Sequence, residues 1–230
     1  MLAPGEAFDV NEPEGFRQHR YVPPTGATTV LLVRHGESEP AMPGRPFPLV
    51  DGHGDPALHP DGRKQAIEVG NRLSGERIEA IYVTNLRRTH ETAAPLALAL
   101  GLAVRVEPDL REVFLGEWEG GEFRARAAAG DPAYLQMLAE QRWDAIPGGE
   151  TNDSVVLRTS AALRRIVSAH PNATVVAVVH GGTIATLLAQ AARSDPFAFI
   201  GAENASISEL VVHDGRVIVR RFNDTAHLLA

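Results

Sequence analysis

The 230-residue chain contains no cysteine. This absence excludes disulfide bonds, thiolate metal ligands and a cysteine nucleophile, which leaves histidine and serine as candidates for nucleophilic chemistry. The sequence also has no uninterrupted apolar run long enough to cross a bilayer. Residues 1–10 carry neither the cationic nor the apolar segment of a secretory signal. We therefore expect a cytoplasmic protein that has no membrane partner.

A surplus of positive charge is lacking too, since the formal net charge is −7 and the isoelectric point is about 5.7. A protein of this charge is poorly suited to bind nucleic acid by neutralising phosphates over a broad surface. A local basic pocket for a small anion stays compatible with the composition. With 230 residues, 44% of them hydrophobic, the chain is large enough for one substantial core.

Apolar runs that predict strands alternate along the chain with segments of helical periodicity. Strands are predicted at residues 28–33, 80–84, 102–106 and 174–179. Helices are predicted at residues 61–73, 86–100 and 183–192, with one or two surface helices within 122–143. Residues 147–152 are predicted to form a turn that ends in a helix cap, followed by a helix that runs to about residue 170. Asp214 and Gly215 join two alternating segments, 206–212 and 217–222, which predicts an edge hairpin. The pattern favours an α/β fold, a three-layer α/β/α sandwich with a mostly parallel central sheet and an antiparallel edge hairpin.

No change of composition marks a second domain. Residues 1–27 are rich in proline, glycine and charge and are predicted to form an irregular N-terminal arm, followed by a single domain over residues 28–230. Residues 36–60 form a long connection with many prolines and glycines. Connections of this length are usually functional or disordered.

Two predicted strands end in the same way. The first is followed by Arg34, His35 and Gly36, and the strand at 174–179 is followed by His180 and Gly181. Ligands of open α/β sheets bind at the carboxyl ends of the strands. Arginine offers a planar fork of donors, and backbone amides at a helix N-terminus favour negative charge, so both groups suit a phosphate.

A neutral imidazole in such a pocket can attack phosphorus, because nearby positive charge disfavours the imidazolium form. The leaving oxygen then needs a proton donor. A carboxyl on a neighbouring loop, such as the polar segment 109–120, would supply it.

Residues Leu32 to Ser38 resemble the Arg-His-Gly signature of the histidine phosphatase superfamily, which includes cofactor-dependent phosphoglycerate mutases and many phosphatases. The resemblance continues in order through residues 55–62, 82–92, 110–120, 149–150 and 179–181, and covers the chain from Thr28 to Leu210. It implies that residues 28–230 form a single histidine-phosphatase-like catalytic domain.

The resemblance also implies a role for individual residues. His35 matches the nucleophile that becomes phosphohistidine, Glu112 matches the proton donor, and His180 matches the second histidine that donates to the phosphoryl oxygens. Arg34, Arg88 and Gly181 match phosphate-binding positions. No metal and no organic cofactor are implied for a simple phosphatase, whose partner is a small phosphorylated substrate.

Three positions depart from the mutase-like and bisphosphatase-like members. Ala41 stands where an asparagine is usual, His53 replaces the glutamine of a Gln-Gly pair, and His59 replaces a threonine. The segment between Glu112 and Gly149 is also too short for the insertion that shapes the mutase pocket. We therefore expect a phosphomonoester hydrolase. The alternatives are a bisphosphate-dependent phosphomutase and a phosphate-binding regulatory protein of low turnover.

Several residues have simpler interpretations. Arg88 follows Arg87 at a helix start, where surface arginines are common. Glu117 and Glu119 lie near Glu112, and carboxylates in a loop are usually solvated, so the role of Glu112 as the acid depends on the motif. Asp51, His53, Asp55 and His59 resemble a metal site, but in a Gly/Pro-rich loop we interpret them as turn formers. Trp118 and Trp143 are expected to pack in a core. The substrate is not predictable from these patterns, and a homodimer is compatible with the exposed hairpin.

Overall fold

The computed structural model describes residues 18–228 of the chain. Of the predicted N-terminal arm, residues 1–17 lie outside the described residues, and residues 18–27 form a turn at 25–26 but no helix or strand. Among the described residues no helix combines the length and the apolarity that a membrane crossing requires.

The central sheet of the described residues has six strands in the order β5-β4-β6-β1-β7-β8. The strands are β1 (Thr28–Arg34), β4 (Ile78–Val83), β5 (Val104–Val106), β6 (Thr174–Val179), β7 (Ile207–His213) and β8 (Arg216–Asp224). The strands β1, β4, β5 and β6 pair in parallel, whereas β7 and β8 pair antiparallel at one edge. The predicted mostly parallel sheet with an edge hairpin is confirmed.

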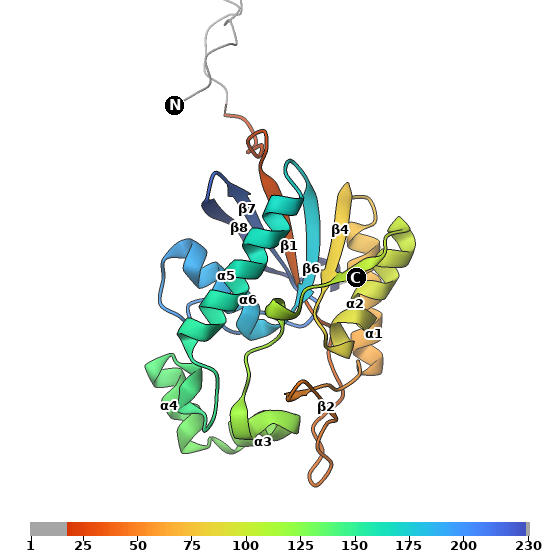
Figure 1. The fold of residues 1–230 in the computed structure, drawn as a ribbon. Helices are drawn as coiled ribbons and strands as arrows, with labels where there is room; N and C mark the ends of the chain where they lie inside the picture. Colours follow the sequence, from red (N-terminus) through yellow and green to blue (C-terminus); the bar gives the residue numbers. More distant parts are fainter. Residues whose placement is uncertain (1–17, 229–230) are drawn as a thin grey trace, which may run out of the picture.

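Four helices flank this sheet, α1 (Pro60–Leu73), α2 (Arg87–Leu100), α5 (Asn152–Ala169) and α6 (Gly181–Ala192). In Figure 1, α1 and α2 cover one face and α5 and α6 the other. Neighbouring residues of β1 point to opposite faces, so that Val30 and Leu32 pack with α5 and α6 while Leu31 and Val33 pack with α1 and α2. The fold is the predicted three-layer sandwich.

The pairing of β1 with β6 sets the position of the two predicted active-site histidines. Arg34 lies opposite Val179 in the parallel register, and the amide of His35 donates to the carbonyl of Val179 at 3.0 Å. His35 and His180 therefore follow the last paired residues of two neighbouring parallel strands. This register brings the two histidines to the same edge of the sheet.

Smaller elements lie beyond the carboxyl ends of the parallel strands (Figure 1). They are the hairpin of β2 (Leu49–Val50) and β3 (His53–Gly54), the 3₁₀ helices η1 (Pro108–Leu110), η2 (Gly116–Gly121) and η3 (Trp143–Ala145), and the helices α3 (Glu122–Ala129) and α4 (Pro132–Glu140). A further 3₁₀ helix, η4 (Ala226–Leu228), packs on α1. Trp118 and Trp143 are buried in a core cluster under this region, as expected.

Some predicted boundaries differ from the structure. The helix predicted to begin at Thr183 begins at Gly181, and the strand predicted from Leu102 begins at Val104. The connection 36–60 contains the β2–β3 hairpin, which was not predicted. Its turn residues Asp51 and Gly52 both have positive φ, 50° and 82°, as a two-residue hairpin turn requires.

A glycine contact holds the turn that follows His35 against the first turn of α1. A Cβ atom added at Gly62 would lie 1.9 Å from the carbonyl oxygen of Glu37, and one at Gly36 would lie 2.5 Å from the carbonyl oxygen of Gly62. Side chains at either position would push the two backbones apart.

We predict that Gly62→Ala lowers the free energy of unfolding by about 1–3 kcal/mol, because the added methyl group has no room and the backbones must separate. Urea unfolding measures this. Gly75→Ala is the matched control, since a Cβ there meets nothing within 4 Å. Equal stability of the two variants would show that the contact at Gly62 does not constrain the loop.

Candidate active site

His35 lies directly after β1 and is 5% exposed. Its Nδ1 lies 2.8 Å from the carbonyl oxygen of Gly36, an acceptor, so we assign the ring proton to Nδ1. The other ring nitrogen, Nε2, accepts a hydrogen bond from Nε of Arg88 at 3.2 Å. His35 therefore presents the lone pair of Nε2 toward the arginine.

The surroundings of His35 keep its ring neutral. Burial, followed by the positive charges of Arg88 and Arg34, lowers the pKa of His35 well below its ordinary value of 6.5. A neutral imidazole has the free lone pair that a nucleophile needs.

Arg88 is positioned by the first turn of α2. Its Nη1 donates to the carbonyl oxygen of Gly54 on β3 at 2.8 Å, in addition to the bond from Nε to His35. Burial lowers the pKa of Arg88 to about 10, so its guanidinium keeps its charge at neutral pH. The predicted surface alternative for Arg88 is wrong, because the residue is 7% exposed.

Arg34, the last residue of β1, donates from Nη1 to the carbonyl oxygen of Ala202. Its Nε is buried without a hydrogen-bond partner among the described residues. Gly181 lies beside it, because a Cβ added to Gly181 would be 3.6 Å from Nε of Arg34. The glycine leaves the space next to this guanidinium open.

His180 is fully buried, and its ring centroid lies 5.2 Å from that of His35. Nε2 of His180 pairs with Oγ1 of Thr84 at 3.1 Å, while Nδ1 has no partner within the part of the chain that the structure describes. Burial and the charge of Arg88 lower the pKa of His180 well below 6.5. Two neutral histidines thus stand together beside two guanidinium groups.

Glu112 approaches this group from the loop after η1. Its Oε1 accepts from the backbone amide of Val113 at 3.0 Å, and its Oε2 accepts from the amide of Gly182 at 3.3 Å, in the first turn of α6. A Cβ at Gly182 would lie 2.7 Å from Oε1 of Glu112. Gly182 was not predicted as a site residue, and the one feature of the sequence that could have indicated it is the pair of glycines after His180.

A buried ion pair braces the loop that carries Glu112. Nε and Nη2 of Arg158 donate to the two carboxylate oxygens of Glu150 at 2.8 and 2.9 Å, and Nη2 also donates to the carbonyl oxygen of Glu112 at 3.1 Å. Burial would raise the pKa of Glu150, but the hydrogen bonds and charge of Arg158 lower it overall. Glu150 and Arg158 thus position this loop together.

Two further side chains near His35 were not predicted. Nδ2 of Asn204 donates to the carbonyl oxygen of His35 at 3.0 Å. Arg124, on α3, donates to Oγ of Ser38 and to the carbonyl oxygen of Glu39, both at 2.7 Å. Arg124 lies in a charged surface segment of the sequence, where no motif distinguishes it from its neighbours.

The residues that suggested a metal site make separate local hydrogen bonds. His59 accepts from the amide of Asp61 at 3.3 Å and caps α1, and Asp55 accepts from the amide of Arg87 at 2.7 Å at the start of α2. Donor atoms that could hold a cation come together at Glu37, His59 and Asp61, within 4.8 Å of one another. That group contains just one of the four residues considered from the sequence.

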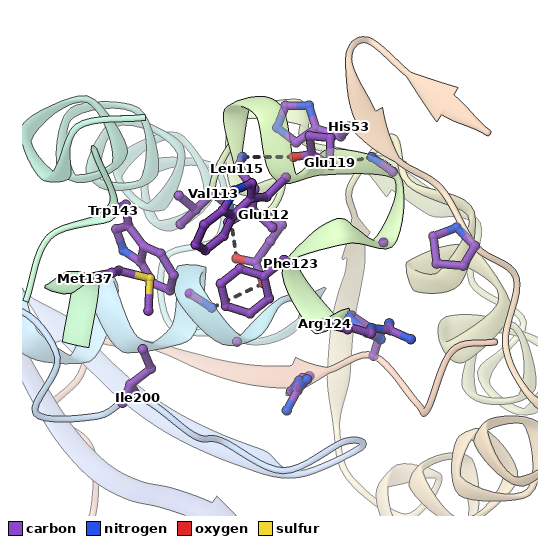
Figure 2. A pocket seen from close by; sticks show the side chains of 18 of the residues that line it. His53, Glu112, Val113, Leu115, Glu119, Phe123, Arg124, Met137, Trp143 and Ile200 are labelled. Carbon is purple, nitrogen blue, oxygen red and sulfur yellow. Dashed lines mark hydrogen bonds between the residues drawn. The ribbon is translucent and has the colours of Figure 1, made fainter. Parts of the chain in front are cut away.

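A cavity of about 440 Å³ opens over this arrangement, and Figure 2 shows part of its lining. Five of the six predicted site residues line it: Arg34, His35, Arg88, Glu112 and Gly181. His180 does not line the cavity and lies against His35 instead. The structure thus brings five predicted residues together around one pocket, and His180 lies behind them against His35.

Comparisons with known proteins agree with this geometry. The family model of the histidine phosphatase superfamily (branch 1) matches residues 30–225. The chain is 32% identical over 203 residues to phosphoglycerate mutase-like protein 4 of Arabidopsis thaliana, a match that covers 86% of each chain. It is 30% identical over 204 residues to a metal-independent phosphoserine phosphatase of the same plant, covering 87% of this chain and 83% of that protein.

A solved structure, the native form of a mycobacterial glucosyl-3-phosphoglycerate phosphatase, superposes with a TM-score of 0.73. Its sequence is 29% identical, and the match covers 86% of this chain and all of that chain. The residues that the family model matches, 30–225, contain both strand ends that carry His35 and His180. The chain belongs to the histidine phosphatase superfamily, branch 1.

Proposed function

We propose that this protein hydrolyses phosphomonoesters through a phosphohistidine formed on Nε2 of His35. The observation that carries the proposal is the neutral, buried His35, whose lone pair at Nε2 lies among positive charges that an incoming phosphoryl group would neutralise.

In the first step, Nε2 of His35 forms a bond to phosphorus and the ester P–O bond breaks. Glu112 gives its proton to the departing oxygen, which leaves as an alcohol. In the second step, water attacks phosphorus, Glu112 takes a proton from that water, and the N–P bond breaks to release inorganic phosphate. The first step leaves His35 phosphorylated and Glu112 deprotonated, and the second step returns both residues to their starting states.

The positive groups stabilise the phosphoryl group during transfer. Nε of Arg34 is buried without a partner among residues 18–228, and Arg88 lies within hydrogen-bond distance of the nucleophile, which supports contacts from both to the phosphoryl oxygens. Nδ1 of His180 likewise has no partner among these residues, which supports its predicted contact to the same group. Because guanidinium groups supply the charge, the proposed reaction needs no metal, in keeping with the similarity to a metal-independent phosphoserine phosphatase of Arabidopsis thaliana.

The segment between Glu112 and Gly149 favours hydrolysis over phosphoryl rearrangement, because it is too short for the insertion that shapes the mutase pocket. This segment holds η2, η3 and the two short helices α3 and α4. Ala41, His53 and His59 are further departures from the mutase pattern. The relatives that are phosphatases support one inference about the substrate of this chain, namely that it is a phosphomonoester.

We predict that a radiolabelled phosphomonoester transfers acid-labile phosphate to His35 and that phosphate is released without added bisphosphate. His35→Ala should abolish both, because the lone pair that attacks phosphorus is gone. His213→Ala, on β7, is the matched control and should keep both. A wild-type protein that neither labels nor releases phosphate would instead be a binding protein, and isomerised product that depends on bisphosphate would indicate a mutase.

Glu112→Gln should lower kcat/KM for alkyl phosphates about 10²- to 10⁴-fold, because an alkoxide cannot leave without a proton. The loss should be much smaller for p-nitrophenyl phosphate, whose leaving group needs no proton. Glu117→Gln, at an exposed position of the same loop, is the control. A similar loss for both substrates would argue that Glu112 supports the loop and does not donate the proton.

The lowered pKa of His35 predicts that its ring stays neutral as the pH falls through 6.5 and takes up a proton only at clearly lower pH. Nuclear magnetic resonance titration of the ligand-free protein, with His35→Asn to assign the signal, measures this. Arg88→Met removes a positive charge from beside the ring and should move the pKa upward. Protonation of the wild-type ring near pH 6.5 would contradict the assignment.

A further inference from the structure

The position of Glu112 decides where the leaving group lies. Two cavities share Arg34 and His35, and Glu112 lines the first of them, the 440 Å³ cavity, but not the second. A proton donor has to reach the oxygen that departs with the leaving group. The leaving group must therefore occupy the cavity that Glu112 lines, which we call the leaving-group cavity.

Beyond Glu112 the wall of the leaving-group cavity is apolar. It is formed by Val113, Phe123, Tyr134, Leu138, Trp143 and Ile200. These side chains come from five separate parts of the chain: the loop that carries Glu112, the helices α3 and α4, and the segments around Trp143 and Ile200. In Figure 2 the labelled apolar side chains Trp143, Met137 and Ile200 lie on the opposite side of Glu112 from Arg124.

We call the part of the cavity around Arg34, His35 and Arg88 the phosphate end. Two other charged side chains that line the cavity, Glu119 and Arg124, already make hydrogen bonds within the protein. The two carboxylate oxygens of Glu119 accept from the amides of Leu115 at 2.9 Å and Gly54 at 2.6 Å. The terminal nitrogens of Arg124 donate to Ser38 and Glu39. Glu119 and Arg124 thus direct their charged atoms at other partners, whereas His53, which also lines the cavity, has a buried Nε2 without a partner in the described part of the chain. A charged or hydroxyl-rich leaving group that packs against the apolar side chains would find few partners there for its polar atoms.

Two side chains of this wall are open to solvent. Leu138 and Ile200 are each 38% exposed, although both lie beside an otherwise buried cluster that includes Met137 and Trp143. Exposed apolar side chains gathered at a cavity mark a surface that an apolar ligand can cover. Covering them would remove apolar area from water, which is favourable.

We propose that the preferred substrates are phosphomonoesters of apolar alcohols, whose hydrocarbon part packs on the apolar wall, against Phe123, Leu138 and Ile200 of that wall. This inference rests on the proposed function and narrows it to one chemical class. The phosphoryl group binds between the arginines, and the hydrocarbon extends past Glu112.

A series of ethyl, butyl and hexyl phosphates tests this directly, because these primary alcohols have leaving groups of nearly equal reactivity. We expect kcat/KM for phosphate release to rise roughly three- to fourfold for each added methylene that the wall covers. Propyl phosphate should also be preferred to glycerol phosphate, its hydroxylated counterpart of equal length. A flat or falling series, or a preference for glycerol phosphate, would overturn the proposal.

Matched variants locate the effect on the wall. Leu138→Ser should lower the ratio of kcat/KM for hexyl phosphate to that for ethyl phosphate by about threefold or more, which corresponds to the contact of at least one methylene. Leu135→Ser lies on the same helix, is 54% exposed in the native protein and does not line the cavity, so it should keep the ratio. Ile200→Ser provides a second wall variant if Leu138→Ser does not fold.

The outcomes separate this inference from the proposed function. If His35 labels and ethyl phosphate is hydrolysed but chain length has no effect, the substrate class is wrong and the phosphatase function stands. If both wall variants change the ratio no more than Leu135→Ser does, the hydrocarbon binds elsewhere and the proposal is likewise wrong. If no ester releases phosphate and His35 never labels, the function itself fails and the inference falls with it.

Discussion

The parallel pairing of β1 with β6 is the constraint on which the site depends. Each strand ends one residue before a histidine, and the register places Arg34 opposite Val179. A shift of the register by one residue would turn the side chains of one strand to the other face of the sheet. Both faces are packed with apolar side chains, so the cores on the two sides hold the register and, through it, the distance between His35 and His180.

Placing arginines beside a buried histidine is costly unless their hydrogen bonds are satisfied. The structure meets part of this need with backbone carbonyl groups, since Arg34 donates to Ala202 and Arg88 to Gly54. When Glu112 is ionised, its carboxylate adds compensating charge and acts to raise the pKa of both arginines, against the effect of burial. Within the described part of the chain, Nε of Arg34 and Nδ1 of His180 are buried beside His35 without a hydrogen-bond partner. An oxyanion that binds there would complete the hydrogen bonding.

The sequence predicted those features that depend on short stretches of chain. The apolar runs before His35 and His180 predict two buried strands, and residues at strand ends share an edge of the sheet, so this pair could be placed from periodicity. The supporting contacts could not, because they join distant residues. Arg158 reaches the carbonyl oxygen of Glu112, 46 positions earlier, and Thr84 meets His180 across 96 positions. The β2–β3 hairpin escaped prediction because each of its strands has two residues, too few to show an alternating pattern.

The two ends of the pocket are built from different parts of the fold. The phosphate end comes from strand ends and helix starts of the central sandwich, where a displacement would disturb both cores. The apolar end comes from α3, α4 and connecting segments outside that sandwich. Under the proposed function, substitutions there would alter the wall that meets the leaving group and leave the strand ends that carry His35 and Arg34 in place. The wall of this chain would then carry more information about its substrate than the signature around His35 does.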